Sequence, residues 1–190
     1  MSTKAVIFDK DGVLMLTEPL YHRAYQGALD HFGAIGLYDW DTHRKRNGMP
    51  ATETYFFLRK KYKVKASLPD FLAEFRKRYK KFMMSEELEV PEGVRELLSA
   101  LKKADIKVAI ATSGHRESTA MTLEKTRLSE EFGTIITSDD VAKGKPDPEI
   151  FLLAAERLGV SPKECLVIGD SINDVLGAKS AGMKVIAITD

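Results

Sequence analysis

Short apolar runs rich in β-forming residues recur along this 190-residue chain, and the last four are separated by segments with helical periodicity. A helix returns to the same face every 3.6 residues and so shows an apolar stripe, whereas a strand buried on both faces is apolar throughout. Continuous apolar strands that alternate with amphipathic helices are typical of a parallel sheet covered on both faces. The predicted strands are residues 4–9, 106–112, 134–137, 165–169 and 184–189.

Two of the intervening segments carry clear apolar stripes. The segment "PEGVRELLSALKKA" and the segment "PEIFLLAAERLG" each place apolar residues three or four positions apart. Both segments are therefore predicted to be helices that pack on the sheet. The predicted stripes are Val94, Leu97, Leu98 and Leu101 in the first, and Ile150, Leu153, Ala154 and Leu158 in the second.

Residues 16–88 interrupt the alternation, because they contain no convincing strand. Aromatic and apolar residues recur there at helical spacing, so we expect a helical insertion between the first strand and the next helix. The fold class is therefore α/β, with a Rossmann-like parallel sheet core formed by residues 1–15 and 89–190 and a helical cap domain formed by residues 16–88. The helical stripes are Leu20, Ala24, Ala28 and Phe32, then Phe71, Phe75, Tyr79 and Phe82.

Composition narrows the function classes. Hydrophobic residues make up 44% and charged residues 30% of the chain, and the net charge is +1. This charge offers no whole-molecule field for nucleic acid or for an anionic membrane, and we expect neither as a partner. A single cysteine, Cys165, excludes an internal disulfide and fits a reducing compartment. With no signal-peptide pattern at "MSTKAVIF" and no run of membrane-spanning length, we expect a cytoplasmic protein.

Polar clusters follow four of the predicted strands. Ligands of open parallel sheets bind beyond the carboxyl ends of the strands, so these clusters are expected to meet at one edge of the sheet. Each cluster alone has an ordinary explanation as loop solvation or helix capping, but four together favour one common site. The clusters are Asp9–Lys10–Asp11–Gly12, Thr112–Ser113–Gly114, the segment with Lys143 and Lys145, and the segment with Asp170 and Asp174.

The carboxylates in these clusters suit a divalent cation. Asp9, Asp11 and Asp170 are hard oxygen donors of the kind that hold Mg²⁺ together with water and a substrate phosphate. Without a cation, three clustered carboxylates would repel one another and one would stay protonated. The sequence therefore predicts a Mg²⁺ site.

The other residues of the clusters suit a phosphate group. Lys145 supplies a positive charge, Thr112 a hydroxyl group, and the backbone near Gly12 and Ser113 further N–H donors. Two nearby carboxylates then permit a division of roles, in which one is a nucleophile and the other transfers a proton. We expect an enzyme of phosphoryl transfer that acts on a small phosphorylated metabolite.

At these motifs the sequence resembles the haloacid dehalogenase superfamily, in the subgroup with a helical cap after the first strand. The resemblance covers nearly the whole chain, although relatives usually continue for another strand and helix beyond "VIAITD", so that the sequence is either truncated or a minimal core. The motifs that carry the resemblance are "FDKDG", "ATSG", "KGKPDPEIF" and "GDSINDVLGAKSAG".

This resemblance implies a role for each matching residue. Asp9 would be the nucleophile and Asp11 the general acid and base. Mg²⁺ would be held by Asp9, the backbone carbonyl of Asp11, and Asp170, with Asp174 as an outer partner. Thr112, Ser113, Gly12 and Lys145 would hold the phosphate. The resemblance further points to His115, Arg116 and the cap-loop residues Asn47 and Gly48 as substrate contacts.

Asp11 argues for a phosphate ester as the substrate, because the haloacid dehalogenases that this motif resembles lack the second aspartate. The preferred function is a Mg²⁺-dependent phosphatase with an aspartyl-phosphate intermediate, acting as a monomer, with a dimer as the alternative. A mutase similar to β-phosphoglucomutase stays open, although "NGMPATET" lacks the arginine that those enzymes place after the glycine. Arg44, Lys45 and Arg46 are then candidates for a displaced phosphate anchor. A receiver-like module that accepts phosphate on Asp9 without turnover is a third alternative.

Overall fold

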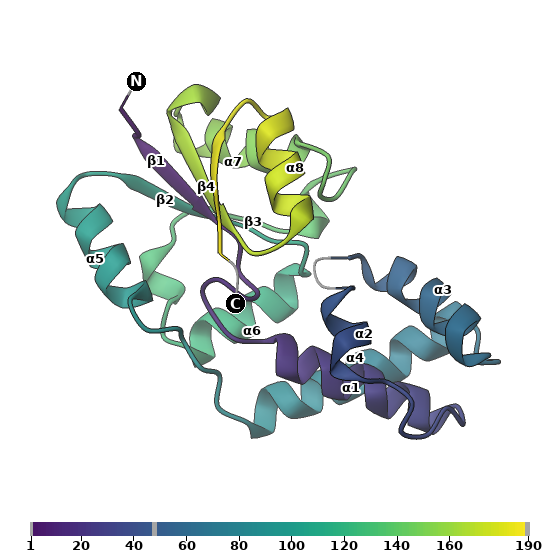
Figure 1. Cartoon of the computed structure of the whole chain (residues 1–190). Helices are drawn as coiled ribbons and strands as arrows, with labels where there is room; N and C mark the ends of the chain where they lie inside the picture. The colour runs from purple at the N-terminus through teal and green to yellow at the C-terminus, as the bar shows by residue number, and fades with distance from the viewer. Residues whose placement is uncertain (1, 47–48, 189–190) are drawn as a thin grey trace. The chain divides into compact units, whose positions relative to one another are not determined.

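The structure is a computed structural model that describes residues 2–46 and 49–188. The chain forms two compact units (Figure 1). One contains Met1–Leu16 and Leu88–Asp190, and the other contains Thr17–Glu87. Within the described ranges, no helix has both the length and the apolar character needed to cross a bilayer.

The first unit is built on a parallel sheet of five strands in the order β3-β2-β1-β4-β5. This confirms the predicted fold class. After β1 the chain first adds strands on one side of it and then crosses over to add β4 and β5 on the other. A crevice for ligands is expected at this reversal, beyond the carboxyl ends of β1 and β4. The strands are β1 (Ala5–Phe8), β2 (Lys107–Ala111), β3 (Ile135–Ile136), β4 (Cys165–Gly169) and β5 (Lys184–Ala187).

Helices cover both faces of this sheet, because successive residues of a strand point to opposite sides. Ala5 and Ile7 of β1 pack into a core with α7 and α8, whereas Val6 and Phe8 pack into a second core with α5 and α6. The helices are α5 (Val94–Lys103), α6 (Arg116–Lys125), α7 (Glu149–Leu158) and α8 (Ile172–Ser180), with 3-10 turns at Ser129–Glu131, Ser138–Asp140 and Pro162–Glu164.

The predicted helical stripes are largely correct. Ile150, Ala154 and Leu158 are buried in α7, and Gly159 ends that helix in the left-handed conformation. The inclusion of Leu97 in the α5 stripe is wrong, because its side chain is 40% exposed while α5 packs through other leucines.

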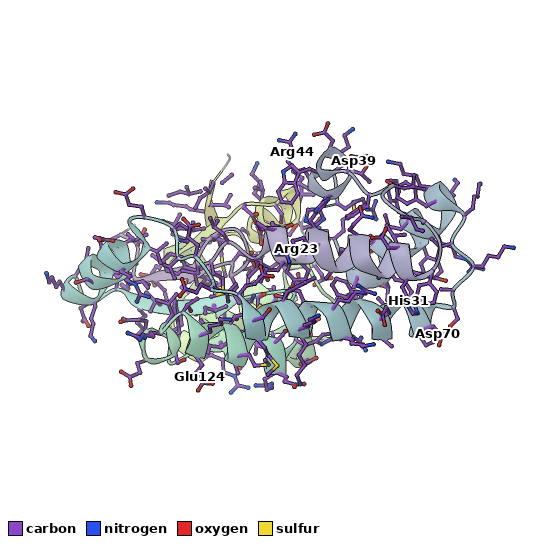
Figure 2. The ribbon with its side chains drawn as sticks, turned by 90° about the horizontal axis from the view of Figure 1, so that it is seen from below. Arg23, His31, Asp39, Arg44, Asp70 and Glu124 are labelled. Atoms are coloured by element: carbon purple, nitrogen blue, oxygen red, sulfur yellow. The ribbon has the colours of Figure 1, made fainter. Side chains whose placement is uncertain are left out.

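The second unit is helical, and its described residues contain no strand. Ser67 caps the last helix by accepting a hydrogen bond from the backbone N–H of Asp70, and Pro69 fits the first turn. Charged side chains such as Arg44 and Asp70 project from the surface of this unit (Figure 2). The helices are α1 (Glu18–His31), α2 (Trp40–Arg44), α3 (Ala51–Tyr62) and α4 (Leu68–Ser85).

Stacked aromatic rings join α1 to α4. The ring centroids of Tyr21 and Tyr79 lie 4.4 Å apart, and those of Tyr25 and Phe75 lie 4.2 Å apart. The predicted α4 stripe contains Phe75 and Tyr79, but the α1 stripe lacks both of their tyrosine partners. Tyr21 and Tyr25 were not predicted to be part of the stripe, because the hydroxyl group of tyrosine makes it equally suited to a surface position.

Candidate active site

Lys145 connects three parts of the first unit through its ammonium group. Its Nζ atom donates hydrogen bonds to Oδ1 of Asp9 at 2.6 Å, to Oδ1 of Asp174 at 2.6 Å and to the carbonyl oxygen of Ala111 at 2.7 Å. An ammonium group has three N–H donors, so protein groups satisfy all of them. Lys145 is 5% exposed and Asp9 is 8% exposed. A buried lysine therefore fixes the carboxylate that follows β1.

Asp174 is held in place by the start of α8. Its Oδ2 atom accepts hydrogen bonds from the hydroxyl group of Ser171 at 2.6 Å and from the backbone N–H of Ser171 at 3.1 Å. Ser171 in turn caps α8 by accepting a bond from the backbone N–H of Asp174, which completes a capping box. Gly169 is required beside it, because a Cβ atom there would lie 2.4 Å from the Cβ atom of Asp174.

Gly12 lets the loop after β1 approach the loop after β4. Its φ angle is +79°, and an added Cβ atom would lie 2.2 Å from Oδ2 of Asp170. The close approach completes a cluster in which one oxygen atom from each of Asp9, Asp170 and Asp174 lies within 4.8 Å of the others. Such a set of hard oxygen donors fits a divalent cation of the Mg²⁺ type.

The charges of this site favour a cation. Burial raises the pKa of Asp9 to about 8, against the opposing effect of Lys145. The carboxylates of Asp174, Asp11 and Asp170 act in the same direction as burial. A bound cation would offset these repulsions and keep Asp9 ionised at neutral pH.

The loop after β2 brings a hydroxyl group and backbone donors to the same edge of the sheet. Thr112 directly follows Ala111, whose carbonyl oxygen binds Lys145. Its side chain is fully buried, and its Oγ1 atom accepts a hydrogen bond from the backbone N–H of Gly114 at 3.0 Å. Ser113 is exposed at the turn. The sheet therefore brings the Asp9 and Thr112 loops next to each other, as the register of β1 with β2 requires.

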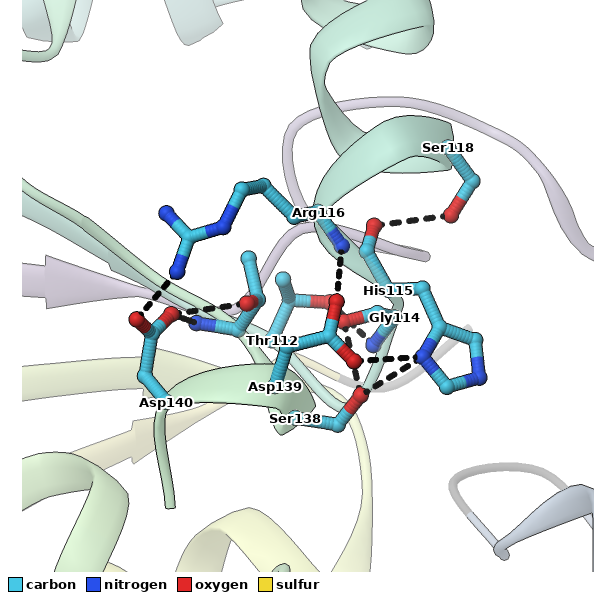
Figure 3. A network of polar contacts seen from close by, with 9 residues as sticks. Thr112, Gly114, His115, Arg116, Ser118, Ser138, Asp139 and Asp140 are labelled. Atoms are coloured by element: carbon cyan, nitrogen blue, oxygen red, sulfur yellow. Dashed lines mark hydrogen bonds and ion pairs between the residues drawn. The ribbon is translucent and has the colours of Figure 1, made fainter.

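His115 and Arg116 belong to a polar network with the loop after β3 (Figure 3). Asp139 binds the Nδ1 atom of His115 at 2.8 Å and accepts a hydrogen bond from the backbone N–H of Arg116, also at 2.8 Å. These bonds lower the pKa of Asp139 below its ordinary value. Arg116 pairs with Asp140 at 2.5 Å, whereas the imidazole of His115 stays 63% exposed with its Nε2 atom turned away from Asp139.

Two further residues of this region, Asp139 and Lys10, were not assigned a role from the sequence. Asp139 anchors His115 and the first turn of α6, and the acidic pair in "TSDD" was the one available signal. Lys10 lies between the two predicted catalytic aspartates, is 1% exposed, and binds Oδ1 of Asp11. No feature of the surrounding sequence distinguishes a buried lysine at this position from a solvated one.

The other predicted site residues have different environments. Lys143, from the same segment as Lys145, has a side chain that is 75% exposed and that lies near Asp147. The predicted substrate contacts Asn47 and Gly48 lie outside the described residues.

Nearly the whole chain matches a known protein family. Residues 6–188 match the family described as haloacid dehalogenase-like hydrolase. A Thermotoga maritima protein named phosphorylated carbohydrates phosphatase is 42% identical over 181 residues, covering 95% of this chain and 82% of the relative. The pyrophosphatase PpaX of Bacillus velezensis is 33% identical, covering 97% of this chain and 82% of its own length.

Solved structures give the same assignment. A Thermotoga maritima protein described as a candidate β-phosphoglucomutase is 39% identical with a TM-score of 0.76, covering 98% of this chain and 85% of that protein. CbbY from Rhodobacter sphaeroides, solved with xylulose-1,5-bisphosphate, is 26% identical with a TM-score of 0.86, covering 99% and 87%. These likenesses confirm the resemblance inferred from the motifs.

The raised pKa of Asp9 predicts how stability depends on pH in metal-free protein. The folded state keeps a proton on Asp9 up to about pH 8, whereas the unfolded chain releases it near the ordinary value of 3.8. Protonation of Asp9 stabilises the folded state fully below pH 3.8. This stabilisation is lost as the pH rises from there through about 8. In EDTA, the melting temperature of Asp9→Asn minus that of the wild type should increase from pH 5 to pH 8.

Asparagine keeps the shape of the side chain but cannot ionise, so this difference isolates Asp9 from other titrating groups. Added Mg²⁺ should reduce the rise, because a cation stabilises the ionised wild-type side chain and not the amide. A difference that stays constant across this pH range in EDTA would contradict the assigned electrostatics.

Proposed function

Because the chain belongs to the haloacid dehalogenase-like hydrolase family, we propose that it is a Mg²⁺-dependent phosphatase that hydrolyses a small phosphorylated metabolite through an aspartyl-phosphate intermediate. The observation that carries this proposal is the buried contact of Lys145 with Asp9 at 2.6 Å, beside a carboxylate cluster at the carboxyl edge of the sheet. The lysine orients one carboxylate for attack, and the cluster supplies the ligands for a cation.

Asp9 and Asp170 would hold the Mg²⁺ ion, together with the backbone carbonyl of Asp11, and Asp174 would act from the outer shell because both of its oxygen atoms bind Lys145 or Ser171. The residues fit such an ion by charge as well. Four carboxylates and the two buried lysines leave a formal charge of −2 when all are ionised. The bound ion would supply positive charge to the phosphate oxygens as they approach these carboxylates.

The reaction divides between two aspartates. An oxygen atom of Asp9 attacks phosphorus while the bond from phosphorus to the alcohol oxygen breaks, and Asp11 donates a proton to the departing alcohol. Asp11 then takes a proton from the water molecule that attacks the aspartyl-phosphate. This second step releases inorganic phosphate and restores Asp9.

The phosphate would be bound mainly by Thr112, Ser113 and the backbone N–H groups of the two loops. The register of β1 with β2 supports this role, because it brings the loop that carries Thr112 and Ser113 next to the loop that carries Asp9. Lys145 would contact the phosphate by exchanging one of its three present hydrogen bonds. Its main role in the proposal is to hold Asp9.

A phosphorylated sugar is the substrate class we favour, on the strength of the Thermotoga relative named for phosphorylated carbohydrates. We further propose that the helical unit, Thr17–Glu87, is the cap that selects the substrate. Its aromatic α1–α4 interface makes it a separate packed body whose surface can vary without disturbing the sheet.

A phosphosugar mutase is the second candidate. It is favoured by the 39% identity to the protein described as a candidate β-phosphoglucomutase. A mutase would return the phosphate to a sugar hydroxyl group instead of water, and it would need a second anion site in addition to the one at the sheet. Arg44, Lys45 and Arg46 are the candidates for that site.

Asp9→Asn should abolish phosphate release from sugar phosphates in the presence of Mg²⁺, with kcat reduced on the order of 10⁴- to 10⁶-fold because the nucleophile is lost. Phosphate release from a panel of phosphorylated metabolites measures this. The matched control is Asp105→Asn, an exposed aspartate of the same unit in a left-handed conformation that asparagine tolerates. Undiminished turnover by Asp9→Asn would refute the mechanism.

The same panel separates phosphatase from mutase. A phosphatase releases inorganic phosphate from each substrate in step with its consumption. A mutase instead interconverts hexose 1-phosphate and hexose 6-phosphate, requires the bisphosphate for full rate, and releases little phosphate. Chromatography of the sugar phosphates alongside the phosphate assay decides between the two functions.

His115 is proposed to contact the substrate, since Asp139 holds its ring while Nε2 faces outward (Figure 3). Loss of a hydrogen bond to a charged phosphate group costs about 1.5–3 kcal/mol, so His115→Ala should raise KM about tenfold or more with a smaller change in kcat. Asp139→Asn should have a weaker effect in the same direction. Glu124→Gln, at the exposed far end of α6 (Figure 2), is the control. An unchanged KM in His115→Ala would remove His115 from the site.

A further inference from the structure

Lys10 is one of the largest side chains that the structure buries completely. It is 1% exposed, although lysine is almost never fully buried without a charged partner. Its Nζ atom binds Oδ1 of Asp11 at 2.5 Å, and the side chain of Asp11 is 17% exposed. The buried ammonium group is therefore paired with a carboxylate that is itself partly exposed.

The backbone around Lys10 is held as firmly as its side chain. The carbonyl oxygen of Lys10 accepts hydrogen bonds from the backbone N–H groups of Leu14 at 3.0 Å and Met15 at 3.3 Å. The backbone N–H of Gly12 donates to the carbonyl oxygen of Met15 at 2.9 Å. These bonds close the loop into a compact turn. They therefore fix the backbone from which the Lys10 side chain extends.

The stem of Lys10 also packs against the Thr112 loop. A Cβ atom added to Gly114 would lie 3.7 Å from Cε of Lys10 and 3.3 Å from Oγ1 of Thr112. The lysine thus occupies the space between the loops that follow β1 and β2. A lysine stem packed between two loops is a rigid support for the ammonium group that contacts Asp11.

We propose that Lys10 is a positioning residue that holds the carboxylate of Asp11 in the orientation required for proton transfer; this inference rests on the phosphatase function proposed above. The two buried lysines divide the two catalytic aspartates between them. Lys145 engages Asp9, and Lys10 engages Asp11. A carboxylate fixed through one oxygen cannot rotate freely, and general acid catalysis depends on such geometry.

The proposal is tested with Lys10→Met, which keeps a long unbranched side chain and removes the ammonium group. The kinetic constant to compare is kcat/KM, which includes the departure of the alcohol. The substrates are p-nitrophenyl phosphate, whose leaving group needs no proton, and ethyl phosphate, whose leaving group does. Mispositioning of Asp11 should lower kcat/KM for ethyl phosphate about 10²-fold, with a much smaller loss for p-nitrophenyl phosphate.

The ratio of the two substrates within one preparation does not depend on the fraction of folded enzyme. Lys10→Gln, which keeps a hydrogen-bond donor without the charge, should give an intermediate ratio. The matched control is Lys4→Met, which removes a surface lysine at the other end of β1 where it pairs with Glu164 at 2.7 Å. Its ratio should equal that of the wild type.

Asp11→Asn distinguishes failure of the Lys10 role from failure of the phosphatase mechanism. If it lowers the ethyl phosphate rate selectively but Lys10→Met lowers both substrates equally or neither, the role of Lys10 is refuted and the phosphatase mechanism stands. If Asp11→Asn itself shows no selectivity, the proposed general acid is wrong, and the role of Lys10 falls with it. Selective losses in both variants support the proposal.

Discussion

The three hydrogen bonds of Lys145 are the interaction on which the rest of the site depends. They join the loop after β1, the last carbonyl group of β2 and the first turn of α8 at one nitrogen atom. Each of these three elements is in turn fixed by packing, by the parallel ladder or by a capping box. A single buried ammonium group therefore fixes the position of the Asp9 carboxylate relative to the sheet.

The cost of this arrangement is an excess of negative charge in a buried place. Asp9 gains a lysine but is surrounded by other carboxylates, and burial raises its pKa to about 8. Glycine at position 12 brings the carboxylate of Asp170 still closer. The protein thus holds acidic groups together that would separate in water, and a divalent cation stabilises such a site by offsetting the repulsion between its carboxylates.

The sequence predicted the strands and the sheet, because apolar runs and strand-end polar residues are local signals that a parallel sheet brings to one edge. It did not reveal the partners of those residues. The contact of Lys10 with Asp11 and that of Asp139 with His115 were not predicted, because neither lysine nor aspartate has a local pattern that identifies its partner. Leu97 was wrongly predicted to be buried, because periodicity identifies the apolar face of a helix but not the width of the stripe that is buried. Contacts between distant loops depend on the tertiary fold, which no local pattern encodes.

In the proposed mechanism, Asp9 carries the phosphoryl group. The direct measurement is to quench the enzyme during turnover with a phosphorylated sugar and Mg²⁺, reduce it with borohydride, and locate the modified residue by tandem mass spectrometry. An aspartyl-phosphate is reduced to homoserine, so homoserine is expected at position 9. Homoserine at another aspartate, or turnover by a fully active enzyme without modification of Asp9, would contradict it.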